Sequence, residues 1–403
     1  MRTDYKYTLR TCYLGYITQA ITNNLAPLLF VVFRKEFGIS LEMIGRLILI
    51  NFGTQILADL LAMRYADRLG YRTSAVIAHA CSAAGLVCLG VLPFVLDEPY
   101  FALTVAVVVY AIGGGIIEVL ISPIVDALPG DAKASAMSLL HSFYCWGQVT
   151  VVLVSTVMIK VLGNAYWPVL PLLWALVPLY NLFRFTRSPL VPPVSDHERT
   201  PLRELFGAKR FMIALVLMVC AGASELTMAQ WSSYFAEKGL GVDKLFGDLL
   251  GPCLFAVLMG TGRAIYGFLG HRLPLKRAML ACAALCVACY AVAVLAPLPI
   301  LSLLGCALCG FSVSLMWPGT FSLSSAAFPK GGTAMFGLLA VCGDLGAALG
   351  PWLAGAAADA TAGMAAAATS ETFGLKVGLG AAAVFPVILF ASLAAWRGRE
   401  AAR

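Results

Sequence analysis

The sequence predicts an all-α integral membrane protein with twelve transmembrane helices in two pseudo-symmetric six-helix halves. Hydrophobic residues make up 60% of the 403 residues, charged residues only 12%, and the mean hydropathy is +0.86. A soluble domain carries roughly 25% charged residues, so this much apolar surface requires a lipid environment. The apolar residues also fall in runs of about 20, the length that crosses a hydrocarbon core of ~30 Å.

Twelve such runs follow one another along the chain. They cover residues 10–33, 41–64, 73–96, 100–127, 134–160, 165–184, 210–236, 246–270, 277–296, 299–327, 332–360 and 374–396. The first run is too long for the core of a signal peptide and is predicted to be retained as a helix. The longest polar interval, 185–209, is predicted to be a cytoplasmic linker between an N-terminal bundle (1–184) and a C-terminal bundle (210–403).

The distribution of basic residues predicts the orientation. Of the 28 Lys and Arg residues, 20 lie in segments on the side that carries both termini, seven on the other side, and Arg263 lies within a run. The positive-inside rule therefore predicts that both termini lie in the cytoplasm. The protein is expected in the cell (inner) membrane. Topology explains the net charge of +7 better than nucleic-acid binding does.

Most of the twelve cysteines lie in apolar runs and are expected to be buried and reduced. We expect the protein to be a monomer.

The two halves carry similar loops, at 64–72 and 270–277, and transporters with such parallel repeats bind substrate at the midplane between halves. The segment MRYADRLGYR at 63–72 resembles the major facilitator superfamily signature G-x-x-x-D-R-x-G-R-R/K: Asp67, Arg68, Gly70 and Arg72 match, and Met63 replaces the first glycine. The resemblance implies the major facilitator fold, alternating access, and a gating latch that includes Asp67, Arg68 and Arg72. The alternative is a basic turn that only sets topology.

Four shorter segments resemble one group of that family, the fucose–galactose–glucose:proton symporters. They are GGGIIEVLISPIVDAL at 113–128, MSLLHSFYCWGQ at 137–148, SELTMAQW at 224–231 and GRAIYG at 262–267. The resemblance implies proton-coupled sugar symport. One departure is Asn24, which stands where this group carries an aspartate, so a coupled proton would depend more heavily on Glu118.

Polar residues three to four positions apart form stripes along four predicted helices. These stripes should face the bundle interior, because lipid offers polar groups no partner. The stripes are Tyr16, Gln19 and Asn23; Asn51, Gln55 and Asp59; Glu118, Ser122 and Asp126; and His141, Cys145 and Gln148.

Glu118 is the main candidate for proton and substrate coupling. An ionisable residue at the bilayer centre costs about 2.5–3.5 kcal/mol on insertion scales and usually faces a cavity or a partner. The alternative is a protonated carboxyl that only bonds neighbouring helices. Asp344, at the repeat position of His141, is a second candidate for titration, and the glycines around it predict close helix packing. These glycines are Gly337, Gly343, Gly346 and Gly350.

Ten residues are predicted to bind substrate: Tyr16, Gln19, Asn23, Asn24, Glu118, His141, Gln148, Glu225, Trp231 and Trp317. His141 can equally bond a backbone carbonyl, and Glu225 can form a salt link or a helix-packing bond. The tryptophans can stack on a sugar ring or pack in the core. Asp59 and Arg263 occupy matching repeat positions and are predicted to form a gating network with Asp67; the alternative is that they bind substrate. His79 is expected to be an ordinary helix-end or loop residue.

The function that best fits these features is secondary active transport of a small sugar- or polyol-like solute by alternating access, with proton symport. The alternatives are a proton-coupled exporter of drugs or metabolites and, with less support, a membrane sensor that moves no solute. Sodium coupling is also open, because a carboxylate with neighbouring carbonyls can bind either ion. No Walker loop, Cys/His ligand set or nucleophilic triad stands out, so no cofactor, metal or catalytic residue is predicted.

Overall fold

The computed structural model describes residues 5–39, 41–130, 132–192, 200–242, 246–247, 249–362 and 370–396, and it contains no strand within these ranges. The helices are α1 (Tyr5–Leu28), α2 (Phe30–Phe37), α3 (Leu41–Leu69), α4 (Tyr71–Val91), α5 (Pro99–Ala127), α6 (Lys133–Leu162), α7 (Val169–Trp174), α8 (Leu176–Arg187), α9 (Leu202–Gly207), α10 (Lys209–Tyr234), α12 (Leu254–Leu269), α13 (Leu275–Leu295), α14 (Pro299–Val313), α15 (Met316–Ala327), α16 (Gly332–Ala362), α17 (Ser370–Ala382) and α18 (Val384–Ala395). Short helical turns flank them at Leu92–Phe94, Asn164–Tyr166, Phe235–Gly239, Leu249–Cys253 and Gly270–Arg272.

The predicted membrane spans coincide with these helices. Ten of the described helical segments are long and apolar enough to cross a membrane. The other two predicted spans are covered by α1 and α3, which have 24 and 29 residues. At 1.5 Å per residue these helices are about 36 and 43 Å long, which exceeds a ~30 Å hydrocarbon core. The prediction of an all-α, multi-pass membrane protein is confirmed.

Local sequence explains where several helices begin and end. Both α5 and α14 begin with a proline, whose fixed φ angle suits the first helical position and whose missing N–H would be unpaired there. Gly70 separates α3 from α4 with φ +84°, a conformation that is unfavourable for residues with a side chain. The glycine of the loop signature is therefore required by the turn itself.

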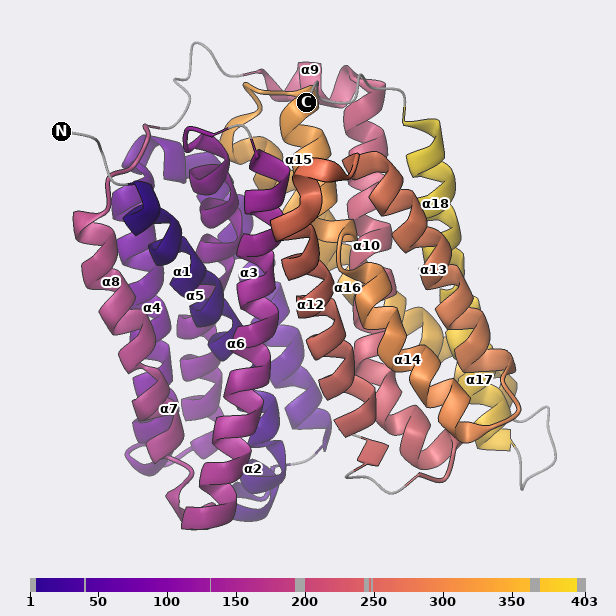
Figure 1. Cartoon of the computed structure of the whole chain (residues 1–403). Coiled ribbons are helices and arrows are strands. Elements are labelled where there is room, and N and C mark those ends of the chain that lie inside the picture. Colours follow the sequence, from indigo (N-terminus) through magenta and orange to yellow (C-terminus); the bar gives the residue numbers. More distant parts are fainter. Residues whose placement is uncertain are drawn as a thin grey trace. The chain divides into compact units, whose positions relative to one another are not determined.

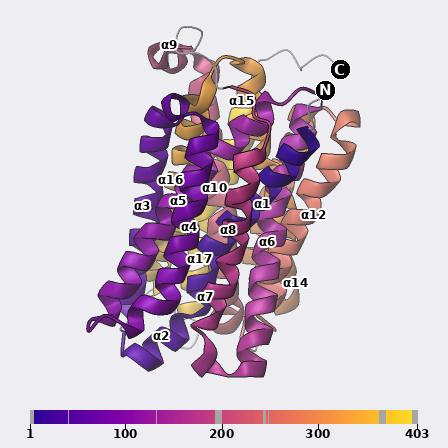
Figure 2. The same ribbon diagram turned by 90° about the vertical axis from the view of Figure 1, so that its left-hand side faces the viewer.

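The chain forms two compact units. Unit 1 comprises Met1–Gly130, Phe143–Arg199 and Gly332–Leu338, and unit 2 comprises Asp131–Ser142, Thr200–Gly331 and Leu339–Arg403. The first turns of α6 thus group with unit 2 and those of α16 with unit 1. Figures 1 and 2 show α4 and α5 running alongside one another in unit 1, where α5 also packs against α3. The predicted boundaries of the two six-helix halves, at 184 and 210, stay a prediction.

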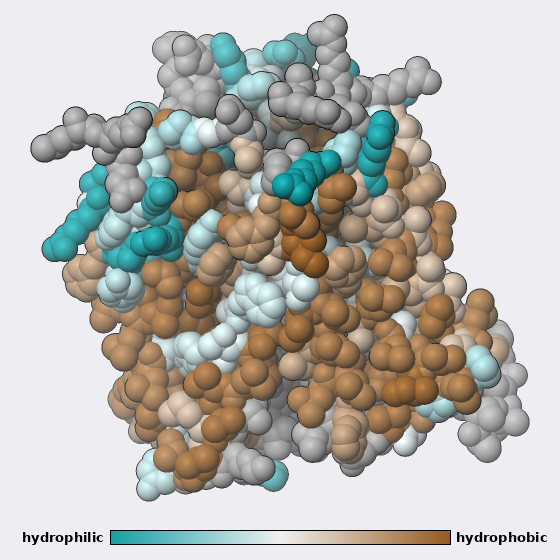
Figure 3. Space-filling model, in the orientation of Figure 1, coloured by the Kyte–Doolittle hydropathy of each residue, from teal (hydrophilic) through white to brown (hydrophobic). Residues whose placement is uncertain are grey.

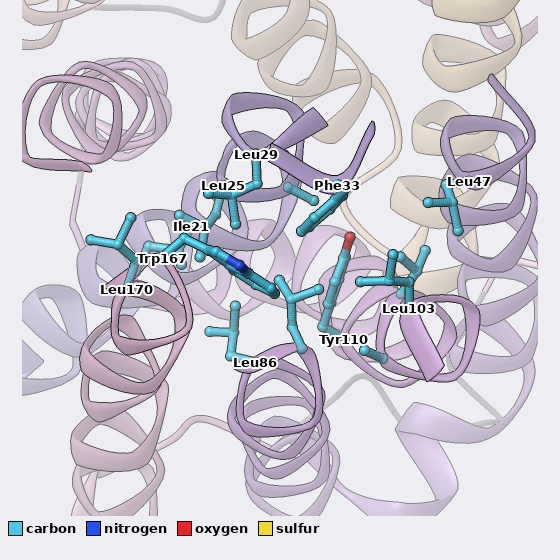
Figure 4. Packing of buried hydrophobic residues seen from close by; sticks show 14 of the residues in the cluster. Ile21, Leu25, Leu29, Phe33, Leu47, Leu86, Leu103, Tyr110, Trp167 and Leu170 are labelled. Carbon is cyan, nitrogen blue, oxygen red and sulfur yellow. The ribbon is translucent and has the colours of Figure 1, made fainter. Parts of the chain in front are cut away.

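Apolar side chains both fill and cover unit 1. One core cluster joins α1, α2, α3, α4, α5, α6 and α7 and includes Trp167, whose ring lies 5.2 Å from that of Phe33 (Figure 4). On the outside, Figure 3 shows apolar residues along most of the helix length, with hydrophilic residues gathered near the end from which α1 starts. Apolar residues on the outside as well as the inside are expected for helices that face lipid.

Glycines bring α10 and α16 into close contact in unit 2. A Cβ atom on Gly346 would overlap the carbonyl oxygen of Val219, and one on Gly222 would overlap that of Gly343. A Cβ on Gly350 would lie 2.7 Å from the carbonyl oxygen of Ala223. Helices in membranes commonly approach through small residues in this way, and the close packing predicted at Gly343, Gly346 and Gly350 is confirmed.

Gly346→Ala is expected to lower the thermal unfolding midpoint of the purified protein. The added methyl would meet backbone, which cannot rotate away, and overpacking of this kind typically costs about 1–3 kcal/mol. The matched control is Gly53→Ala in α3, where no described atom lies within 4 Å of the new Cβ. Alanine favours a helix over glycine by about 1 kcal/mol, so this control should keep or raise the midpoint. Equal midpoints for the two variants would contradict the packing argument.

Candidate functional site

Polar side chains of α1, α3 and α5 meet inside unit 1 in three successive layers. The layers join Tyr16 Oη to Ser122 Oγ at 2.9 Å, Gln19 Nε2 to Glu118 Oε2 at 2.5 Å, and Gln55 Nε2 to Asn23 Oδ1 at 2.9 Å. Each layer thus joins two of the predicted stripes. The expectation that these three stripes face the interior is confirmed.

Three consecutive glycines in α5 allow this approach. A Cβ on Gly115 would lie 2.7 Å from the carbonyl oxygen of Gln55 and 2.8 Å from Oδ1 of Asp59, and a Cβ on Gly113 would overlap Ser82. The backbone of α5 therefore lies directly against α3 and α4. As a result Asp59 is fully buried within unit 1, ten residues before the end of α3.

Glu118 lies at the centre of the polar layers. The residue is 8% exposed, and its carboxylate accepts a hydrogen bond from the amide of Gln19, which is 3% exposed. A carboxyl in this position has the partner that an acid buried in a membrane requires. It can also gain or lose a proton while its amide neighbour stays neutral, which is the chemistry that proton coupling needs.

Asn24 and Gln148 lie where α1 and α6 approach each other within unit 1. Asn24 Nδ2 donates to the carbonyl oxygen of Ala20 at 2.8 Å and lies 3.5 Å from the hydroxyl of Tyr144. A Cβ on Gly147 would lie 2.9 Å from Ala20, and Gln148 follows it in sequence. Both Asn24 and Gln148 are half-buried. Their assignment to substrate binding stays a prediction.

A buried ion pair occupies unit 2. Arg263 Nη2 lies 3.0 Å from Glu225 Oε2, and the two residues are 3% and 9% exposed. Arg263 also donates to the carbonyl oxygens of Ser314, at 3.1 Å, and His141, at 3.3 Å. For Glu225 the structure thus shows the salt link, one of the alternatives left open by the sequence. The carboxylate that Arg263 bonds is thus that of Glu225. The gating pair of Arg263 with Asp59 stays a prediction.

The other candidates in unit 2 lie around α15 and α16. The His141 ring is 5.7 Å from that of Phe321, which in turn meets Trp317 edge-on at 6.3 Å. Trp317 covers Gly343, the residue before Asp344, which is 9% exposed. On another turn of α16, the Pro351 carbonyl accepts a hydrogen bond from the indole of Trp231 at 3.1 Å. Both tryptophans are half-buried and pack against α16, so each has a packing role whether or not it also contacts substrate.

The residues of the loop signature surround the junction of α3 and α4. Arg68 is exposed in the last turn of α3, and the side chain of Asp67 lies outside the described part of the structure. Arg72 donates to the carbonyl oxygens of Thr186, at 2.7 Å, and Ser188, at 3.0 Å. These carbonyls belong to the C-terminal end of α8, where terminal carbonyls lack helical partners and carry partial negative charge. Arg72 therefore ties the loop to the end of α8.

Arg72→Ala is expected to loosen this end of α8. The substitution removes both hydrogen bonds and the cation at a helix C-terminus, an arrangement that stabilises by about 0.3–1 kcal/mol when exposed. Hydrogen exchange of the amides in 184–192 should become several-fold faster, with a smaller effect for Arg72→Lys, whose ammonium can still bond one carbonyl. The control is exposed Arg68→Ala. Unchanged exchange in Arg72→Ala would show that the two bonds do not hold α8.

His79 was expected at a helix end or in a loop, and that expectation is wrong. It is fully buried in the middle of α4, with Nδ1 2.7 Å from the carbonyl oxygen of Ala75 and Nε2 2.8 Å from the amide nitrogen of Asn181. The same amide donates to the carbonyl oxygen of Thr11 at 3.1 Å, so these bonds join α1, α4 and α8. The signal was present in the sequence: a lone histidine within the apolar run 73–96 requires a buried partner.

Membrane-length helices with polar side chains paired between them are the architecture of a multi-pass membrane transporter. The family model of the Major Facilitator Superfamily matches residues 12–351, and the chain belongs to this family. Among the described residues, no group of three or more His, Cys, Asp or Glu side chains is arranged to hold a metal ion.

Solved structures of the family share this fold. One is FucP, a Major Facilitator Superfamily transporter in the outward conformation, at 16% identity and TM-score 0.79 over 97% of this chain and 98% of that chain. A point variant of the E. coli fucose:proton symporter FucP matches at 17% identity and TM-score 0.76, with the same coverage. The human organic anion transporter MFSD10 (TETRAN) matches at 16% identity and TM-score 0.73, over 97% of this chain and 100% of that chain. The predicted resemblance to the fucose permease group is thus confirmed at the level of the fold. Curated protein sequences give no match.

Proposed function

We propose that the chain is a proton-coupled symporter of a sugar or polyol-like solute in the cell membrane, with both termini in the cytoplasm. The observation that carries the proposal is Glu118, held by Gln19 between layers of hydroxyl and amide groups in unit 1. A titratable group bonded to neutral hydrogen-bonding groups suits a proton and a polyhydroxylated solute. The fold shared with FucP, described as a fucose:proton symporter, supports the same assignment.

In this mechanism Glu118 is the proton carrier. Its carboxylate takes up a proton when the transport path is open to one side and releases it when the path opens to the other. Gln19, Tyr16 and Asn23 provide donors and acceptors that can exchange bonds with solute hydroxyls. Asp344, buried in unit 2, is the second proposed titrating site.

Uptake into liposomes that contain the purified protein tests this function. A solute library is first screened for thermal stabilisation, because a ligand that binds the native state raises its apparent stability. Stabilising solutes are then offered with an inward pH gradient, or with a sodium gradient at equal pH. We expect a sugar or polyol to accumulate with the pH gradient and to stop accumulating when an uncoupler is added.

Three outcomes would overturn the proposal. Accumulation with the sodium gradient alone would replace the proton by sodium. Uptake that is unchanged by the uncoupler would exclude coupling to protons. Accumulation of organic anions without any sugar or polyol would change the substrate class, and the library includes them because MFSD10 is described as an organic anion transporter.

A further inference from the structure

A small, partly open cavity lies within unit 1, lined by residues of α1, α2, α3, α4 and α5. Its volume is about 40 Å³. Its lining consists of Thr22, Asn23, Ala26, Phe33, Leu47, Asn51, Phe52, Leu89, Leu103, Val107 and Tyr110. Figure 4 labels Phe33, Leu47, Leu103 and Tyr110 of this lining, and it shows the hydroxyl of Tyr110 directed toward Phe33 with Leu103 beside Tyr110.

The polar part of the lining suits water. Asn51 is 8% exposed, and its side-chain oxygen has no hydrogen-bond partner among the described residues. A buried acceptor left unpaired costs about 1–3 kcal/mol. A water molecule needs roughly 10–15 Å³ of such volume and two to four polar partners, so about three waters fit, whereas a sugar ring does not. None of the described lining residues is acidic or basic, so the lining offers no charge to hold an ion.

Polar groups lead from this cavity to Glu118. Along α5, Tyr110 precedes Gly114 by one turn, and Gly114 precedes Glu118 by another, a total rise of about 12 Å. Between them, Gln55 donates to Asn23, which lines the cavity. The Gln55 side-chain oxygen and the Thr22 hydroxyl lie 3.6 and 3.4 Å from the place where a Gly114 Cβ would be. Because Gly114 has no side chain, this part of α5 faces hydrogen-bonding groups and is not blocked by an apolar side chain at position 114.

We propose that this cavity holds the water through which Glu118 exchanges its proton with the face of the membrane at which α1 ends and α3 and α5 begin. The loop charges predict that this face is extracellular. A hydronium donates its proton to the water chain, each water passes one proton on, and an O–H bond forms at the Glu118 carboxylate, so no other reactant is needed. The inference rests on the proposed role of Glu118 as proton carrier.

Radiolytic labelling tests for the water directly. X-ray pulses convert bound water into hydroxyl radicals that oxidise adjacent side chains. Tyr110 is only 2% exposed, yet it and Phe52 should be oxidised in the wild-type protein, and Asn51→Leu should reduce this oxidation at least five-fold. The buried control in the same unit is Phe185, which does not line the cavity and should stay unmodified in both proteins.

Transport supplies the second readout. In liposomes with an internal pH dye, Asn51→Leu should slow solute-driven proton uptake about ten-fold while solute counterflow continues, and Asn51→Ser should retain proton uptake because it keeps a polar group and space for water. If Asn51→Leu does not fold, Leu103→Phe fills the same cavity without removing a polar group and should have the same effect.

Absence of label on wild-type Tyr110, or wild-type proton uptake in a folded Asn51→Leu or Leu103→Phe, would overturn the inference. If instead Glu118→Gln still accumulates solute, the proposed function fails, and the cavity's water is judged by the labelling alone.

Discussion

Glu118→Gln is expected to abolish accumulation of the solute by a pH gradient while counterflow of the same solute continues. With one proton per solute, a gradient of one pH unit sustains at most about a ten-fold accumulation, since 1.4 kcal/mol corresponds to a factor of ten. In the variant, the solute concentration inside the liposomes should reach about the concentration outside and no more. Glutamine has nearly the same shape, and its carbonyl oxygen can still accept the hydrogen bond from Gln19, so the binding geometry should survive.

Uptake and counterflow in the same liposomes measure this effect. The matched control is Asp126→Asn, which makes the equivalent acid-to-amide change two turns further along α5 and should accumulate solute as the wild type does. Accumulation by Glu118→Gln at the wild-type ratio would show that Glu118 is not the proton carrier. Loss of both counterflow and accumulation would show that Glu118 is needed for solute binding or movement, beyond proton transfer.

Arg263→Ala is expected to produce the largest loss of stability. The substitution leaves the Glu225 carboxylate buried without its cation, and breaking a buried ion pair from one side typically costs about 3–5 kcal/mol. It also removes the donors to the carbonyl oxygens of Ser314 and His141. Glu225→Gln should cost less, because the amide oxygen can still accept a hydrogen bond from Arg263.

Thermal unfolding of the purified variants measures these differences. At about 2–4 °C per kcal/mol for 150–250 residues, Arg263→Ala should lower the midpoint by roughly 6–20 °C. Replacing both partners, as Arg263→Met with Glu225→Leu, should recover part of the loss because neither charge is then left unpaired. The control is Arg203→Ala on the exposed side of α9. If the unfolding midpoint of Arg263→Ala lies within about one degree of the midpoint of this control, the ion pair does not contribute to stability.

The sequence was sufficient to predict which side chains lie on the same helix face. Gln19 and Asn23, or Glu118 and Ser122, are one turn apart, and a 3.6-residue period aligns such residues whatever surrounds the helix. The sequence could not indicate that Gln19 bonds Glu118 or that Asn23 bonds Gln55, because these pairs are 99 and 32 residues apart. Such pairings depend on how α1, α3 and α5 are rotated and shifted against each other.

Repeat alignment gave no indication of the bond between Arg263 and Glu225, because symmetry relates equivalent positions in two halves and not bonded side chains. It placed Arg263 opposite Asp59, and that gating pair stays a prediction. The structure shows the Arg263 guanidinium on Glu225 of α10 and Asp59 buried against Gly115 of α5. His79 illustrates a second limit: its partner Asn181 is 102 residues away and gives no periodic signal near the histidine.

Hydropathy and loop charge are local properties, since each run of about 20 apolar residues favours the membrane independently of the others. They were therefore enough to predict a membrane protein with twelve helices, and the loop signature was enough to indicate its family. Close packing through glycines, the ion pair of Arg263 and Glu225, and the cavity beside Asn51 arise from contacts between helices distant in the chain. Such contacts depend on side-chain shape in three dimensions, which no one-dimensional pattern records. Only the tertiary structure therefore shows these contacts.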